Sequence, residues 1–260
     1  MAYTTINKHT DYFNTVLYTG NGSAGNAQTG VGFQPDFTWI KGRSATYNHG
    51  LYDAVRGVTK RIVSNNNNAE DTRADALTAF GTDGFTLGTD SQVNANTATY
   101  ASWNWKASGS TASNSNGSIN STVSVNTTAG FSIVTYTGTG STATVGHGLG
   151  VVPSMIIIKR RDDTDDWQIY HKSIGNTKYL AFNSTAAATT SSTRWNDTTP
   201  TNSVFTVGTA GATNGSGRTF VAYCFGVILN LFEEIEFFKQ DEGNKCLQDF
   251  VLRHLYPLQH

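Results

Sequence analysis

The sequence is short of cysteine, proline and charge, and the shortages of cysteine and charge each exclude a class of protein. Its 260 residues include only two cysteines and four prolines. Two cysteines are too few for a disulfide framework or a cysteine-ligated metal cluster. Charged residues make up 14% of the chain and leave a formal net charge of −1. We therefore expect neither nucleic acid nor an anionic membrane surface as a partner.

Long apolar runs are also missing. The longest apolar stretch, FVAYCFGVILNLF at 220–232, contains a glycine and an asparagine and is shorter than a membrane-spanning helix. The opening residues, MAYTTINKHTDYF, lack the apolar core of a secretory signal. We expect a protein that is made in the cytosol and is not inserted into a membrane.

The sequence is rich in glycine, small polar residues and aromatic residues. Glycine occurs 26 times, and Phe, Trp and Tyr together make up 12% of the chain. Aromatic residues favour strands, whereas glycine with Ser, Thr and Asn favours the tight turns between them. This composition predicts many short strands.

Two long segments of the chain repeat each other in one register. Tyr18 and Tyr136 stand 118 positions apart, and the same offset aligns many other residues. The aligned pairs include Gly30 with Gly148, Pro35 with Pro153, Lys41 with Lys159, Tyr52 with Tyr170 and Asn65 with Asn183. A register kept over fifty residues indicates a tandem duplication.

Each copy reads as a set of strands with turn signals between them. FTWIK at 37–41 and MIIIK at 155–159 are continuous apolar runs, as expected of central strands that are covered on both faces. The sequence predicts an all-β chain of two tandem antiparallel β-sandwich units, of a jelly-roll or lectin-like kind, plus a short C-terminal helical segment. The predicted segments are an N-terminal leader at 1–12, repeat 1 at 13–107, a Ser/Asn/Gly-rich linker at 108–130, repeat 2 at 131–226 and an amphipathic helical tail at 227–260.

The tail departs from the pattern of the repeats because its apolar residues recur at helical spacing. An apolar helix face of this size needs a surface to cover it, so we expect the tail to take part in assembly. The predicted assembly residues are Ile228, Leu231, Phe232, Ile235, Phe238, Phe250 and Leu255.

Four stretches of the sequence resemble a known family. MAYTTINKHTDYFNTVLYTGNGS at 1–23, GVGFQPDFTWIK at 30–41, HGLYDAVRG at 49–57 and FGTDGFTLG at 80–88 closely resemble tail-fibre and other virion-surface proteins of marine tailed phages, including phages of cyanobacteria. The resemblance covers residues 1 to about 225. It implies a multimeric virion component with a lectin-like β-sandwich, and it names no ligand.

The residues give no catalytic constellation. A glycosidase needs two carboxylates that face each other across a cleft. Glu70 is the only glutamate before position 230, and Asp53 aligns with His171 in the other copy, so no acid pair repeats with the fold. We expect no enzyme, although a polysaccharide depolymerase stays open as a less favoured hypothesis.

Two sets of residues are candidate ligand sites, and each set also has a simpler structural interpretation. Aromatic rings in loops can stack on a sugar face, and Tyr47, Trp167 and Trp195 lie in predicted loops; the plainer reading is a structural role. The run RRDDTDDW places Asp162, Asp163, Asp165 and Asp166 on one loop, where their oxygens could bind Ca²⁺. The plainer reading there is a solvated turn that Arg160 and Arg161 neutralise.

Lys41 and Lys159 each end a buried run, so we expect their charged ends to reach solvent at the rim. The favoured function is a virion protein that binds a host-surface glycan or protein through its loops. The alternative is a purely architectural capsid or tail accessory protein without a host ligand. In either case we expect a homo-oligomer, such as a trimer, with other virion proteins as partners and no cofactor.

Overall fold

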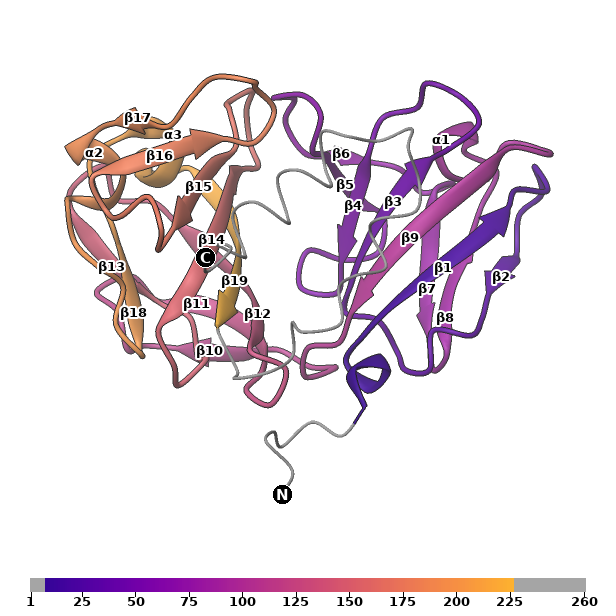
Figure 1. Cartoon of the computed structure of the whole chain (residues 1–260), viewed down its shortest axis with the longest axis horizontal. Helices are drawn as coiled ribbons and strands as arrows, with labels where there is room; N and C mark the ends of the chain where they lie inside the picture. Colours follow the sequence, from indigo (N-terminus) through magenta and orange to yellow (C-terminus); the bar gives the residue numbers. More distant parts are fainter. Residues whose placement is uncertain (1–7, 227–260) are drawn as a thin grey trace, which may run out of the picture.

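The computed structural model describes residues 8–226, and it shows an all-β chain of two tandem units (Figure 1). The helices in this range are short: η1 (His9–Asp11), α1 (Ser91–Asn94), α2 (Ser192–Trp195) and α3 (Gly211–Asn214). None of them is long enough to cross a membrane. The predicted helical tail and its assembly residues lie outside the described range.

The first unit contains a large sheet and a small one. The large sheet has the strand order β1-β9-β3-β4-β5-β6, and the small sheet has the order β2-β8-β7, with all pairs antiparallel. The strands are β1 (Phe13–Thr19), β2 (Asn26–Gln28), β3 (Phe37–Gly42), β4 (Gly50–Asp53), β5 (Lys60–Val63), β6 (Asp71–Thr72), β7 (Leu77–Gly81), β8 (Gly84–Leu87) and β9 (Thr99–Trp105).

The second unit repeats the strand order of the first large sheet, but its small sheet has two strands where the first unit has three. Its large sheet runs β12-β19-β14-β15-β16-β17, which is the first unit's order in equivalent strands, and β13 pairs with β18 in a small sheet. The strands are β12 (Phe131–Thr137), β13 (Ala143–Gly146), β14 (Pro153–Arg160), β15 (Gln168–His171), β16 (Lys178–Ala181), β17 (Thr189–Thr190), β18 (Val204–Val207) and β19 (Thr219–Gly226). The predicted fold of two tandem β units is confirmed.

The predicted linker at 108–130 is wrong, because this segment contains two strands. β10 (Ala112–Asn114) and β11 (Ser121–Asn126) extend the second large sheet beyond β12. Val123 is buried against the core of the second unit, and Val125 packs beside it. Two alternating valines drive the pairing, but the many serines and asparagines around them hide that signal.

The sheets stack as four layers with the two large sheets facing each other in the middle (Figure 1). Ile40 of β3 faces the core inside the first unit, whereas Trp39 faces the core between the units. On β14, Ile156 faces the second unit's own core and Ile157 faces the shared core. Because each large sheet is buried on both faces, its central strands need continuous apolar runs, as predicted.

A tyrosine and an asparagine are placed alike in both units. The Tyr18 hydroxyl donates to the Val93 carbonyl oxygen at 2.8 Å, and the Tyr136 hydroxyl donates to Thr213 at 2.6 Å. At the next position in each helix, Asn94 and Asn214 are fully buried and hold neighbouring loops through their amides. The two units therefore share these hydrogen bonds of a buried tyrosine and a buried asparagine.

Candidate functional site

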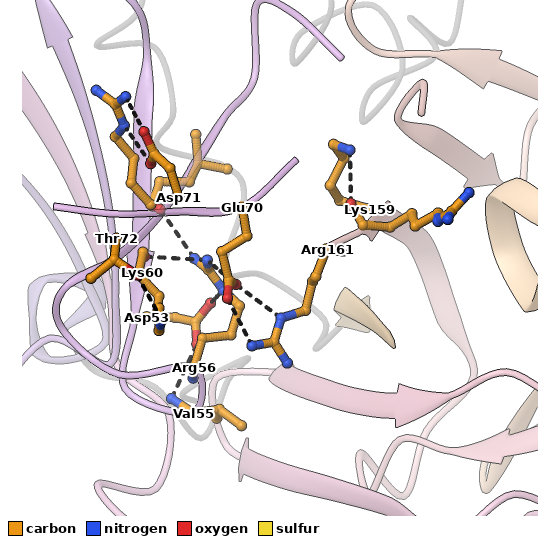
Figure 2. Close-up of polar contacts among 12 residues, drawn as sticks. Asp53, Val55, Arg56, Lys60, Glu70, Asp71, Thr72, Lys159 and Arg161 are labelled. Carbon is orange, nitrogen blue, oxygen red and sulfur yellow. Dashed lines mark hydrogen bonds and ion pairs between the residues drawn. The ribbon is translucent and has the colours of Figure 1, made fainter. Parts of the chain in front are cut away.

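A buried ionic centre joins the two units (Figure 2). It contains Asp53 and Arg56 at the end of β4 and Tyr223 on β19 of the second unit. Arg56 forms an ion pair with Asp53 in which neither side chain is exposed to solvent. The Tyr223 hydroxyl donates to Asp53 Oδ2 at 2.7 Å, and Arg56 Nη2 donates to the Tyr223 hydroxyl oxygen at 3.3 Å. Both units therefore contribute to this hydrogen-bonded centre: Asp53 and Arg56 come from the first unit and Tyr223 from the second.

The local sequence positions Asp53 for this role. β4 ends at Asp53, and the backbone N–H groups of Val55 and Arg56 donate to Asp53 Oδ1 at 3.1 and 2.8 Å. An aspartate that accepts from residues two and three positions ahead stabilises a turn. The Arg56 side chain extends back along β4, and its Nη2 donates to the Leu51 carbonyl oxygen at 3.0 Å. The turn therefore fixes both members of the ion pair.

Glu70 connects this centre to a second arginine. Its carboxylate accepts from Arg56 at 3.0 Å and from two nitrogens of Arg161 at 2.9 and 3.0 Å. The fork-like geometry is the strongest that an arginine and a carboxylate can form. The Glu70 backbone N–H also donates to the Arg161 carbonyl at 2.8 Å, and Asp165 N–H donates to Asn67 at 3.0 Å. The loop before β6 is thereby bound to the loop after β14.

Burial and ion pairing shift the pKa values of Arg56 and Glu70 in opposite directions. Burial would lower the pKa of Arg56, but the carboxylates of Asp53 and Glu70 raise it above its ordinary value. Burial would raise the pKa of Glu70, but Arg161 and Arg56 hold it below its ordinary value. Burial raises the pKa of Tyr223 well above its usual range. These three groups therefore keep one protonation state at neutral pH.

The chemistry of the centre is that of a clamp. Its tyrosine stays protonated and its arginine stays charged, so neither serves as a general acid or base near neutrality. Within residues 8–226, no three His, Cys, Asp or Glu side chains come together in a way that could hold a metal ion. The centre instead holds two halves of one body in a fixed relation, because unpairing any buried charge is costly.

Trp167, a predicted sugar-binding residue, is part of the same interface. Its side chain is fully buried in the core between the units. The indole Nε1–H donates to the carbonyl oxygens of Val63 and Asn66 in the first unit, at 3.0 and 3.2 Å. A ring that is enclosed by both units cannot stack on a ligand from solvent, so the structure contradicts this prediction.

Trp195 and Tyr47 have different environments. Trp195 is 2% exposed, packs edge-on against Tyr170 and donates to the Lys178 carbonyl at 3.0 Å. The prediction that it binds a ligand is therefore also wrong. Tyr47 is half-buried, and one face of its ring stacks on Tyr100 at 5.9 Å. Of the three predicted aromatics, Tyr47 alone keeps solvent-facing surface, and its role as a ligand-binding residue stays a prediction.

The aspartate loop is organised around arginine. Arg160 forms ion pairs with Asp162 at 2.9 Å, Asp163 at 3.0 Å and Asp165 at 3.8 Å. Asp166 accepts from the Asn183 amide at 2.9 Å. Three of these carboxylates pair with the Arg160 guanidinium. The structure therefore contradicts the predicted calcium site.

Lys159 does not reach solvent as expected. The residue is fully buried, and its ammonium donates to the Arg160 carbonyl at 2.8 Å. Burial lowers its pKa to about 8, although Asp165 opposes the shift. Its repeat partner Lys41 makes the same contact with Gly42 but is only partly buried. The charged neighbours of the Lys159 ammonium are Arg160 and the carboxylates of the aspartate loop, which lies beside this strand end.

Sequence reasoning missed Asp53, Arg56 and Tyr223. Asp53 aligns with His171 in the other copy, so a search for residues that repeat with the fold does not point to it. Where two copies face each other, however, complementary contacts can use different residues on the two sides, as Asp53 and Tyr223 do here.

The family profile of a domain of unknown function (DUF7483) matches residues 8–230, and the chain belongs to this family. No curated protein and no solved structure matches it.

Proposed function

We propose that this member of the DUF7483 family is a non-enzymatic structural protein of a bacteriophage virion, a tail-fibre or surface component that binds the host through its loops. The phage part of this proposal rests on the sequence resemblance to marine phage proteins. The observation that carries the proposal is the clamp of Asp53, Arg56, Glu70, Arg161 and Tyr223, which makes one rigid body of two β units.

A rigid body suits attachment because binding loops lose less entropy when their frame is already fixed. Several exposed loops extend from this frame, including 21–25, 43–46, 184–187 and 196–199. They are rich in Gly, Ala, Ser, Thr and Asn, which supply adaptable hydrogen-bonding groups of the kind found in polar recognition surfaces. A host-surface glycan or protein is the ligand class that such loops fit.

Cell adsorption tests the host-binding part. Labelled full-length protein is incubated with a panel of marine cyanobacterial cells, with their purified surface polysaccharide and with virion fractions. We expect saturable adsorption to some strains, and we expect it to fall when exposed loop residues 43–46 or 184–187 are replaced by Gly-Ser sequences. Replacing 196–199 in the same way shows which of these loops contact the ligand.

Other outcomes would overturn the proposal in distinct ways. Firm binding to virion fractions without adsorption to any cell would favour a purely architectural protein. Release of reducing ends from the polysaccharide would favour a depolymerase. We further propose that residues 227–260 drive homo-oligomer formation, and replacing Phe232 and Ile235 with Asp in the full chain should lower the mass measured by light scattering.

A further inference from the structure

Strand β1 is an unusually long free sheet edge. Among the described residues, 8–226, it ends the first large sheet and pairs on one side only, with β9 (Figure 1). It has seven residues, whereas the other strands at sheet edges in residues 8–226 have between two and five. Proteins usually keep edge strands short because a long one offers a template for pairing with another chain.

The side chains of β1 carry none of the usual protection. The sequence FNTVLYT has no charged residue and no proline, and these are the residues that commonly block an edge. Leu17, near its centre, is 62% exposed, the highest value among the large apolar residues of the described chain. An exposed leucine on a long uncharged edge strand indicates a surface that pairs.

The backbone of β1 offers hydrogen-bonding groups at alternate residues. Gly20 N–H donates to Ala98 and Lys106 N–H donates to Tyr12, which places the even-numbered residues of β1 in hydrogen-bonded pairs with β9. In an antiparallel sheet the intervening residues then direct their N–H and C=O groups to the other side. These include Leu17 and Thr19, whereas the N–H of Thr15 donates to the Asn14 side chain at 2.9 Å, a bond that a pairing strand would replace.

The second unit shows what fits such an edge. Its equivalent strand, β12, is paired on that side by β11, antiparallel over six residues. The same fold therefore takes an extended antiparallel strand at this position. β1 itself is such a strand, and because it is uncharged, two copies can approach without repulsion between like charges.

We infer that β1 is a self-association surface that pairs antiparallel with β1 of a second copy about a two-fold axis. With Leu17 opposite Leu17 of the copy, each exchanges both backbone hydrogen bonds, and Thr19 lies opposite Thr15. The two exposed leucines cover each other, and two large sheets become one continuous sheet. This contact is independent of host binding and of the assembly proposed for residues 227–260.

Sedimentation equilibrium of the full chain tests the pairing. Wild type should associate in the micromolar range, and Leu17→Lys should weaken that association at least tenfold because it brings two charges together. Val152→Lys is the matched control, since Val152 is the other exposed large apolar residue and lies outside β1. A wild type that is monomeric at all concentrations, or equal effects of both substitutions, would overturn the inference.

Disulfide trapping tests the register in a Cys246→Ser background, with buried Cys224 kept. Hydrogen-bonded partners have Cα atoms about 5.5 Å apart, within reach of a disulfide. Leu17→Cys should therefore form covalent dimers on oxidation. Thr19→Cys should not, because the two Thr19 residues stand about 14 Å apart along the strands. An oligomer that persists in Leu17→Lys and gives no Leu17→Cys crosslink would overturn this inference and leave the assembly through 227–260 in place.

Discussion

Glu70 of the first unit accepts two hydrogen bonds from Arg161 of the second, at 2.9 and 3.0 Å, across 91 positions of sequence. Arg56 donates to the same carboxylate from the other side. One glutamate thus binds an arginine from each unit, and Arg56 also has the carboxylate of Asp53 as a partner. The contact accounts for how two similar β units become one body.

Replacing Glu70 with Gln should therefore be costly. The change leaves two arginines with one buried carboxylate between them, and we expect the free energy of unfolding to fall by about 2–3 kcal/mol. Urea denaturation followed by tryptophan fluorescence measures this loss. Asp163→Asn is the control, because Asp163 pairs with Arg160 at the surface and is 60% exposed; its cost should stay below about 0.5 kcal/mol. Similar costs for the two variants would refute the clamp.

The same glutamate gives a testable acid sensitivity. Its folded-state pKa lies below the ordinary value of 4.5, so its contribution is complete above 4.5 and is lost as the pH falls through the folded pKa. Wild type should therefore lose more stability than Glu70→Gln between pH 5 and pH 3. Parallel pH dependence of the two proteins would count against this assignment.

Lys159 should affect stability in alkaline solution. Its pKa is about 8 in the folded protein against an ordinary 10.5, so the unfolded chain binds the proton more tightly. Stability should therefore rise as the pH increases from 8 to 10.5. Lys159→Met should remove this rise and stabilise the protein at pH 7 by on the order of 1–3 kcal/mol. Denaturation at pH 7 and pH 10 measures both effects.

Lys41→Met is the matched control for Lys159→Met, because Lys41 is the repeat partner and is only partly buried. It should change the pH dependence less. A rise between pH 8 and pH 10 that is equal in wild type and Lys159→Met would show that the Lys159 ammonium is not the source.

The duplicated tyrosines should have equal energetic roles. Tyr18→Phe and Tyr136→Phe each remove a hydroxyl that donates to a buried carbonyl, and each should cost about 1–2 kcal/mol. Tyr179→Phe is the control, since it keeps the ring under Arg194 and should cost less than about 0.5 kcal/mol. Chemical denaturation of the three variants measures the free energy of unfolding that each one loses. A large cost for only one of the two would show that the units have diverged at this anchor.

Trp167 distinguishes a structural role from ligand binding. Trp167→Phe keeps most of the ring but removes the donor for Val63 and Asn66, so we expect a loss of about 1–3 kcal/mol. Faster amide hydrogen exchange should appear in residues 63–66. Loss of host binding at unchanged stability would instead support the ligand role that burial argues against.

Much of the fold could be predicted because the repeat and the strand pattern are local signals. The continuous apolar runs at 37–41 and 155–159 predicted strands that are covered on both faces, and the structure buries them so. β11 was missed because its two core valines stand among serines and asparagines. The candidate site was missed because Asp53 and Tyr223 lie 170 positions apart and neither belongs to a sequence motif.

The sequence alone determined the class of fold, the duplication and the position of the main strands along each unit, because hydrophobic alternation and turn residues act over a few positions. Only the tertiary structure decided how the two units meet. That contact places Trp167 in a core instead of a binding loop and pairs Glu70 with Arg161. The physical reason is that a buried charge or indole is satisfied by partners from a distant part of the chain, and no local pattern records who those partners are.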